Sequence, residues 1–228
     1  MPLDQWHGAG TLDRAQEILR AHPNLSEANI HTAAILGDAD KARRFVQQER
    51  ALATAKGGPR KWDALTYLCF SKFLRLDPGR SAGLVASAQV LLEHGADANT
   101  GWFEPNHQPN PGWESVLYGA AGVAHHEAMT RLLLQHGADP NDGEVYYHTP
   151  ESYENGALRA VVETGRVRPE NLAAMLLRKC DWHDIEGVRY LLQHGAEPNR
   201  LTQWGKTALH NAALSDNPIW VADKIHVG

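Results

Sequence analysis

The sequence has few cysteines, no long apolar run and no block of charge of one sign. Cys69 and Cys180 are the only cysteines among 228 residues, too few for a scaffold held by several disulfides, so we expect reduced thiols. No segment approaches the roughly 18 consecutive apolar residues of a membrane helix. Met1–His7 have neither the basic start nor the apolar stretch of a secretory signal. These absences predict a cytoplasmic protein that does not enter a membrane.

The balance of charge is also modest. The 22 Lys and Arg residues against 27 Asp and Glu residues give a formal net charge of −5. Because the basic residues are scattered rather than gathered into a patch that could neutralise phosphates, we expect no nucleic-acid partner. The apolar share of 43% is ordinary for a folded globular protein and excludes a disordered chain.

A repeated segment organises the sequence. The pattern Leu-Leu-x-His-Gly-Ala-Asp/Glu-x-Asn occurs at residues 91–99, 133–141 and 191–199. Each copy has the features of an apolar helix that ends at a glycine in the left-handed region. The Asp and Asn that follow are typical of a turn held by bonds from side chains to the nearby backbone. Self-similarity of this kind predicts an array of repeats.

An apolar stripe at positions x, x+3, x+6 and x+7 marks the helices of this array. Its clearest copy is Ile185, Val188, Leu191 and Leu192, which predicts a buried Leu192 whose replacement by alanine costs about 2–5 kcal/mol. The stripes end at residues 19, 46, 92, 133, 162, 192 and 226. Units of roughly 33 residues, each with two short helices and a turn, fit most of these intervals. We therefore predict one domain over 1–228, with about six complete units, a partial last one, and insertions near 50–61, 72–81 and 98–114.

The first helix of a unit is clearest at residues 205–213, Gly-Lys-Thr-Ala-Leu-His-Asn-Ala-Ala. This segment resembles Gly-x-Thr-Pro-Leu-His-x-Ala-Ala of the ankyrin-repeat family, with Ala208 in place of proline. The repeated segment above resembles that family's second helix and loop. The chain is thus similar to ankyrin-repeat proteins of a degenerate, bacterial-like cytosolic type, strongly over 113–214 and more loosely over 10–100. The resemblance implies an all-α solenoid of stacked helix–turn–helix units with loop or hairpin connections.

Thirteen histidines raise the question of a metal site. Three of them occupy the same position of successive repeats and cannot converge on one ion: His94, His136 and His194. The resemblance gives His210 a structural hydrogen-bonding role. Cys180 and His183 supply only one of the two ligand pairs usual in structural zinc sites. We find no complete phosphate-binding loop and no nucleophile–base pair, so the sequence predicts no metal, no cofactor, no catalytic residue and a stability that a chelator leaves unchanged.

The resemblance implies that partners bind to the loop tips and to the exposed side of the first helices. Large aromatic side chains in polar loops are typical of binding hot spots. By this criterion the candidate partner contacts are Trp102, Phe103, His107, Trp113, Tyr146, Tyr147 and Trp204. If the units stack in register, these residues lie on one side of the array. The alternative is that the 98–114 loop folds back and buries its aromatic residues on its own unit.

The sequence therefore predicts a monomeric protein–protein interaction module without catalytic activity, whose partner it does not name. The second hypothesis is a regulatory or targeting segment of a longer effector or enzyme whose catalytic part lies elsewhere.

Overall fold

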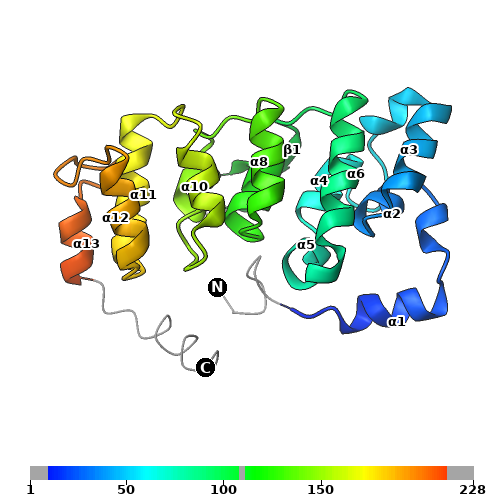
Figure 1. The fold of residues 1–228 in the computed structure, drawn as a ribbon, viewed down its shortest axis with the longest axis horizontal. Helices are drawn as coiled ribbons and strands as arrows, with labels where there is room; N and C mark the ends of the chain where they lie inside the picture. The colour runs from blue at the N-terminus through cyan, green and yellow to red at the C-terminus, as the bar shows by residue number, and fades with distance from the viewer. Residues whose placement is uncertain (1–9, 108–110, 215–228) are drawn as a thin grey trace.

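The fold is described from a computed structural model, which defines residues 10–107 and 111–214. Over these residues the chain forms an elongated row of helices with one small β-hairpin (Figure 1). The α-helices are α1 (Asp13–Ala21), α2 (Ile30–Ile35), α3 (Ala39–Gln48), α4 (Ala64–Cys69), α5 (Lys72–Leu76), α6 (Ser81–Glu93), α7 (Val116–Tyr118), α8 (Glu127–Gln135), α9 (Gly143–His148), α10 (Gly156–Val162), α11 (Pro169–Asp181), α12 (Ile185–Gln193) and α13 (Ala208–Leu214). The shorter elements are η2 (Leu25–Glu27), η3 (Arg50–Ala53), η4 (Pro78–Arg80), the π-helical turn η5 (Gly119–Val123), and the strands β1 (Gly101–Glu104) and β2 (Gly112–Ser115).

The helices stand in two adjacent rows. The first-helix row contains α2, α4, α7 with η5, α9, α11 and α13, each in contact with the next. The second-helix row contains α3, α6, α8, α10 and α12, which stand side by side in Figure 1. This arrangement confirms the all-α solenoid with hairpin connections that the sequence predicts.

The core lies between the two rows and is contributed by every unit. In the second-helix row the stripe residues Ala88, Leu91, Met129, Leu133 and Val161 are all fully buried. Because each unit covers the apolar face of its neighbour, the core extends along the array instead of closing around one centre. No helix in the described ranges is long and apolar enough to cross a membrane.

The stripe of α12 departs from the sequence prediction. Leu191 is fully buried, but Leu192 is 42% exposed and Ile185 is 63% exposed. Within the described residues α12 is the last helix of its row, so no further second-row helix covers this side. The prediction that Leu192 is a core residue is therefore wrong. The next stripe, Ile219, Ala222 and Ile225, lies outside the described residues.

The first stripe also departs from the prediction. Helix α1 does not stand in the second-helix row: in the view of Figure 1 it lies below the ends of the neighbouring helices, roughly at right angles to that row. None of its own residues is buried, and Ile18 is 38% exposed, although Leu12 just before the helix is buried. The apolar spacing of residues 12–19 therefore marks an amphipathic helix but not a stacked second helix.

The asparagine of the first repeated segment joins its loop to the loop of the next copy. As predicted, the side chains of Asp97 and Asp139 hold their own turns, accepting hydrogen bonds from the backbone N–H of Asn99 (2.8 Å) and Asn141 (2.9 Å). Asn99 also reaches the next copy: its Oδ1 accepts from the Asp139 N–H (2.9 Å), and its Nδ2 donates to the Gly137 carbonyl (3.2 Å). Hydrogen bonds therefore connect the loops of these two successive copies.

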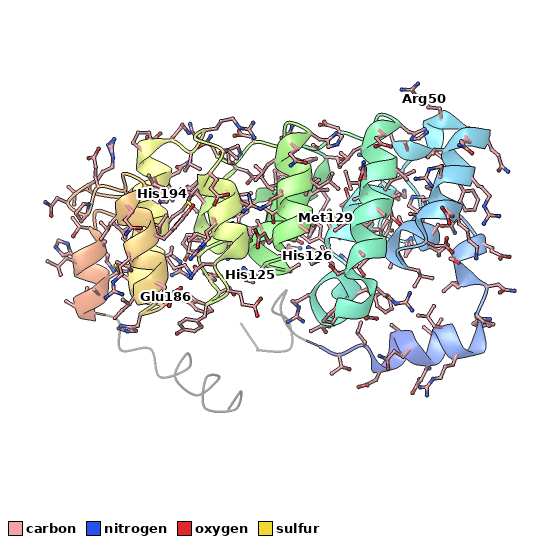
Figure 2. All side chains as sticks on the ribbon, viewed as in Figure 1. Arg50, His125, His126, Met129, Glu186 and His194 are labelled. Atoms are coloured by element: carbon pink, nitrogen blue, oxygen red, sulfur yellow. The ribbon has the colours of Figure 1, made fainter. Side chains whose placement is uncertain are left out.

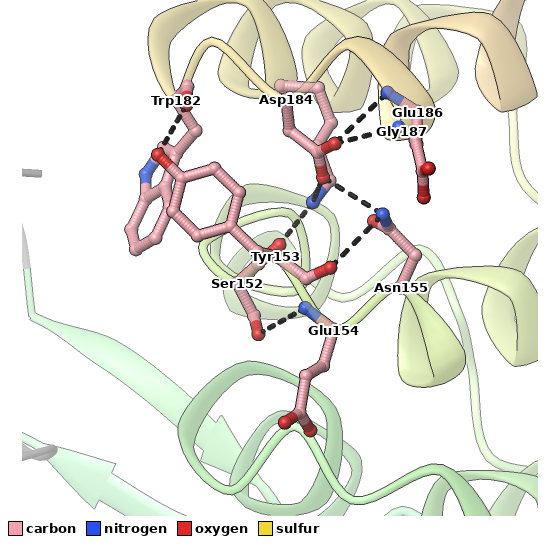
Figure 3. Close-up of polar contacts among 9 residues, drawn as sticks. Ser152, Tyr153, Glu154, Asn155, Trp182, Asp184, Glu186 and Gly187 are labelled. Atoms are coloured by element: carbon pink, nitrogen blue, oxygen red, sulfur yellow. Dashed lines mark hydrogen bonds and ion pairs between the residues drawn. The ribbon is translucent and has the colours of Figure 1, made fainter. Parts of the chain in front are cut away.

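A buried polar network joins two units at the other end of the helices (Figure 3). Lys179 of α11 is fully buried, and its Nζ lies 2.8 Å from Asp184 Oδ2 and also donates to the Ser152 carbonyl. The same carboxylate oxygen accepts from Asn155 Nδ2 (2.9 Å), while Oδ1 caps α12 by accepting from the N–H of Gly187 (3.1 Å). The α9–α10 connection is therefore fixed to the α11–α12 turn by charge-assisted hydrogen bonds.

Backbone packs against backbone between the α2–α3 turn and helix α6. Gly37 connects α2 to α3 with φ +71°, and a Cβ there would lie 2.9 Å from the Leu84 nitrogen. Reciprocally, a Cβ at Gly83 of α6 would collide with the Gly37 carbonyl oxygen. Glycine at both positions lets α6 approach the α2–α3 turn.

We expect Gly83→Ala to lower the free energy of unfolding by about 1–3 kcal/mol, because the added methyl meets backbone that cannot rotate away. Alanine's better helix propensity, about 1 kcal/mol, works against this loss. The control is Gly143→Ala in α9, where an added Cβ meets nothing within 4 Å. Urea unfolding measures both, and equal stabilisation of the two variants would show that the units are not in this close contact.

Candidate functional site

The hairpin sorts its side chains onto two faces. Strands β1 and β2 pair antiparallel, with Trp102 opposite Glu114 and Phe103 opposite Trp113. Successive side chains of a strand point to opposite faces, so each cross-strand pair shares one face. Phe103 is 58% exposed and Trp113 47% exposed, whereas Glu114 is fully buried. The hairpin therefore presents two aromatic rings to solvent and turns one carboxylate inward.

Aromatic side chains form an unbroken row along the first helices and their preceding loops, and we call this set the aromatic row. In order along the array it consists of His31, Tyr67, Trp62, Phe70, Tyr118, His148, Tyr147 and Trp204. Successive ring centroids lie between 4.7 and 5.9 Å apart, the range of offset and edge-to-face aromatic pairs. The row therefore extends from the first unit to the loop before α13.

The aromatic candidates of the 98–114 loop differ in burial. Trp102 is half-buried, with its ring centroid 4.9 Å from that of Trp62 and 6.2 Å from that of Phe70. Its ring thus packs against residues that flank α4 of the preceding unit, not against its own unit as the fold-back alternative expects. Phe103 and Trp113 stay exposed on the opposite face of the hairpin.

Of the candidates after residue 140, two are in contact with each other and one is not. Tyr147 and Trp204 are neighbours in the aromatic row, with ring centroids 5.4 Å apart, and Trp204 is 42% exposed. The guanidinium of Arg178 lies 4.4 Å from the centroid of Tyr147 and so fixes this ring from α11. Tyr146, one residue earlier, packs against the apolar core instead. His107 lies apart from the row, in a polar cluster beneath the hairpin.

This polar cluster consists of His107, Glu114, Glu144, His148 and Glu151, and we call it the hairpin cluster. Glu144 Oε2 lies 3.3 Å from His107 Nε2 and 3.2 Å from His148 Nε2. His148 Nδ1 lies 2.8 Å from Glu151, which also pairs with Arg178 of α11. The chain of charges thus runs from the hairpin through α9 to the next unit.

Local structure explains how these residues meet. Asp142 caps α9 by accepting a hydrogen bond from the N–H of Glu144 (3.0 Å), which starts the helix there. Glu144 and His148 are four residues apart and therefore lie on one face of α9. Strand β2 runs directly into α7, where Ser115 accepts from the N–H of Tyr118 (3.1 Å). The cap holds the end of β2, and Glu114 with it, beside α9.

Burial shapes the protonation of the cluster. Burial, helped by the charge of Glu144, raises the pKa of Glu114 to about 7. Burial alone would lower the pKa of His148, but its hydrogen bonds to Glu144 and Glu151 outweigh that effect and raise the pKa to about 9. Burial would raise the pKa of Glu144, yet the hydrogen bond from His148 brings it below its ordinary value. At neutral pH, His148 is therefore a cation between two carboxylates, whereas neither carboxylate oxygen of Glu114 has a hydrogen-bond partner among the described residues.

The sequence reasoning missed most of this cluster. Glu144, His148 and Glu151 at spacings of four and three residues are a visible signal of one polar face. Glu114 gave no such signal, because its inward direction depends on the hairpin register. His107 was singled out only as a polar neighbour of aromatic residues.

Three of the repeat histidines make hydrogen bonds within their own units. His94 and His194 place Nδ1 2.7 and 2.8 Å from the carbonyl oxygen four residues earlier. His210 Nδ1 lies 2.7 Å from Thr207 Oγ1. Figure 2 shows His194, directly after α12, well away from His126, directly before α8. These side chains are spread over the units and share no common centre.

Neither cysteine has the surroundings of a catalytic nucleophile. Burial raises the pKa of Cys69 well above its ordinary value, and Asp63 adds to the shift. Burial likewise raises the pKa of Cys180. Because the thiolate is the reactive form, both residues are poor nucleophiles at neutral pH.

Comparisons with known proteins agree with this architecture. Residues 173–219 match a family model described as ankyrin repeats (many copies). Among solved structures, the human ASB11 ankyrin repeat domain is similar to this chain with a TM-score of 0.53 and 18% sequence identity. The likeness covers 87% of this chain and 97% of that domain, and at this identity it concerns the fold. No curated protein sequence matches the chain.

Proposed function

We propose that this chain, an ankyrin-repeat protein, binds another protein through its exposed hairpin face and the neighbouring aromatic row, without catalysing a reaction. Ankyrin repeats are generally protein–protein interaction modules, and specificity in such scaffolds lies in the residues that do not build the core. We also propose that it acts as a monomer in the cytoplasm.

The observation that carries the proposal is the pair Phe103 and Trp113. Both rings project from a hairpin that packs beside α9 in the first-helix row, and both keep about half of their surface in water. Large exposed aromatic residues that adjoin one another cost solvation free energy in the free protein and are typical of interface centres. The pair therefore supports a partner that offers an apolar side chain or groove.

We expect the double variant Phe103→Ala, Trp113→Ala to capture at least about tenfold less partner than the parent, because hot-spot aromatics contribute ~2 kcal/mol or more each. Truncating exposed rings removes little internal packing, so the melting temperature should stay nearly unchanged. The measurement is affinity capture from lysate of the source cell, with proteins identified by mass spectrometry.

The matched control is Ile18→Ala on α1, an exposed apolar residue that belongs to another part of the array. Trp102→Ala is unsuitable as a test because Trp102 packs on Trp62 and Phe70, so its loss lowers stability as well. A double variant that melts with the parent and captures the same proteins in the same amounts would contradict the proposal.

The second candidate function is a regulatory or targeting segment of a longer effector or enzyme. The mass of the endogenous protein separates the two candidates, since a mass near 25.2 kDa leaves no room for a catalytic part elsewhere.

A further inference from the structure

Three side chains of the hairpin cluster converge as metal ligands do. One donor atom from each of His107, Glu114 and Glu144 lies within 4.8 Å of the other two. An ion bound at roughly 2.0–2.2 Å from its ligands separates opposite donors by up to about 4.4 Å. Small side-chain rotations are therefore enough to bring all three donors onto one ion.

Glu114 is the observation that points to a ligand. Its side chain is fully buried, and neither carboxylate oxygen has a hydrogen-bond partner among the described residues. A buried carboxylate without a partner is strongly disfavoured, and a cation is the group that compensates it best. The carboxylate lies beside His107 and Glu144, which are the two groups able to hold such a cation with it.

The surroundings of these ligands suit a bound ion. His148 Nε2 lies 3.2 Å from Glu144 Oε2, and His148 Nδ1 lies 2.8 Å from Glu151, an outer set of contacts that holds a ligand carboxylate in place. The side chains of His107 and Glu144 are 22% and 17% exposed, so one side of the cluster opens to solvent. An ion can enter there, and water can complete its coordination.

We propose that His107, Glu114 and Glu144 bind one divalent transition-metal ion of the Zn²⁺ class. One imidazole nitrogen with two carboxylates suits Zn²⁺ or Mn²⁺, whereas Mg²⁺ and Ca²⁺ prefer all-oxygen sites. This proposal replaces the sequence-based expectation that a chelator leaves stability unchanged.

The site joins two separate elements of the fold. Glu114 lies in β2 and His107 follows β1, while Glu144 lies in the first turn of α9 in the next unit. A bound ion therefore fastens the hairpin to its neighbour and fixes the orientation of its exposed face. Zinc binding at this site does not require a protein partner, so the purified protein alone is sufficient for the test.

The test is titration of the purified, chelator-stripped protein with ZnSO₄, followed by calorimetry and thermal melting. We expect one tight equivalent per chain. At ~100 times the dissociation constant, linkage should raise the melting temperature by roughly 5–10 °C for a chain of this size. MgCl₂ at the same concentration should give no such shift.

Glu114→Gln is the decisive variant, because the amide keeps the shape of the side chain and removes the buried charge. We expect it to fold, to melt at or above the metal-free parent, and to bind Zn²⁺ at least tenfold more weakly. His194→Ala, which removes an exposed histidine directly after α12, should bind Zn²⁺ as the parent does. A parent that takes up no zinc would overturn the proposal. Parent-like affinity of a folded Glu114→Gln would also overturn it, since scattered surface histidines would then be the ligands.

Discussion

Replacing Asp184 by alanine is expected to lower the free energy of unfolding by about 3–5 kcal/mol, measured by urea denaturation. The variant leaves the ammonium of Lys179 in a fully buried position without its carboxylate, and an unpaired buried charge is costly. It also removes the cap of α12, a further loss of about 1 kcal/mol. Both effects act on the contact between two neighbouring units.

The control for this prediction is Lys179→Met, which removes the buried charge and keeps an apolar chain of similar length. Asp184 retains the helix cap and Asn155 in that variant, so the loss should be clearly smaller. Burial on its own would raise the pKa of Asp184, but its bonds to Lys179 and Asn155 lower it below the ordinary 3.8. The stability that Asp184 contributes to the fold is therefore fully present above about pH 3.8, and it is lost as the pH falls through the lowered pKa of Asp184. If Asp184→Ala and Lys179→Met lowered the free energy of unfolding equally, an unpaired Lys179 charge would not explain the instability of Asp184→Ala.

Leu191→Ala should cost about 2–5 kcal/mol, while Leu192→Ala, one position later, should cost less than about 1 kcal/mol. The two residues share a helix and a substitution, so helix propensity and side-chain chemistry are matched. They differ in surroundings, since Leu191 is fully buried and Leu192 is 42% exposed. The measurement is again urea denaturation of the purified variants. A loss for Leu192→Ala as large as that for Leu191→Ala would place another helix against this side of α12.

The repeat architecture could be predicted from the sequence because its signals lie within short segments of the chain. The glycine of the repeated segment has positive φ in all three copies, +105° at Gly95, +93° at Gly137 and +88° at Gly195. The stripe at x, x+3, x+6 and x+7 predicts which face of a helix is apolar, since that depends on spacing alone.

Spacing does not predict whether a neighbour covers that face. Leu92 and Leu133 occupy the same stripe position as Leu192 and are buried, because another second-row helix follows each of them. Leu192 has the same local pattern without such a neighbour among the described residues. The error therefore arose from treating a property of the stack as a property of the helix.

The hairpin cluster could not be predicted for a similar reason. Which side chains of β1 and β2 turn inward depends on the pairing of Trp102 with Glu114, and a shift of one residue would exchange the two faces. The loop composition suggested that aromatic residues meet a partner. It did not distinguish Trp102, which packs against Trp62 and Phe70, from Phe103, which is exposed.

The buried Lys179 specifies which unit its own unit stacks on. Similar repeats are interchangeable to a folding chain, because one apolar face fits another nearly as well as its own neighbour. Lys179 is the largest fully buried side chain among the described residues, and its acceptors come from the preceding connection and from its own turn. A unit stacked in the wrong place, or on a second molecule in the wrong order, would bury that ammonium without them and lose several kcal/mol. One buried charge thus favours stacking of the α11–α12 unit on the α9–α10 unit over its stacking on any other.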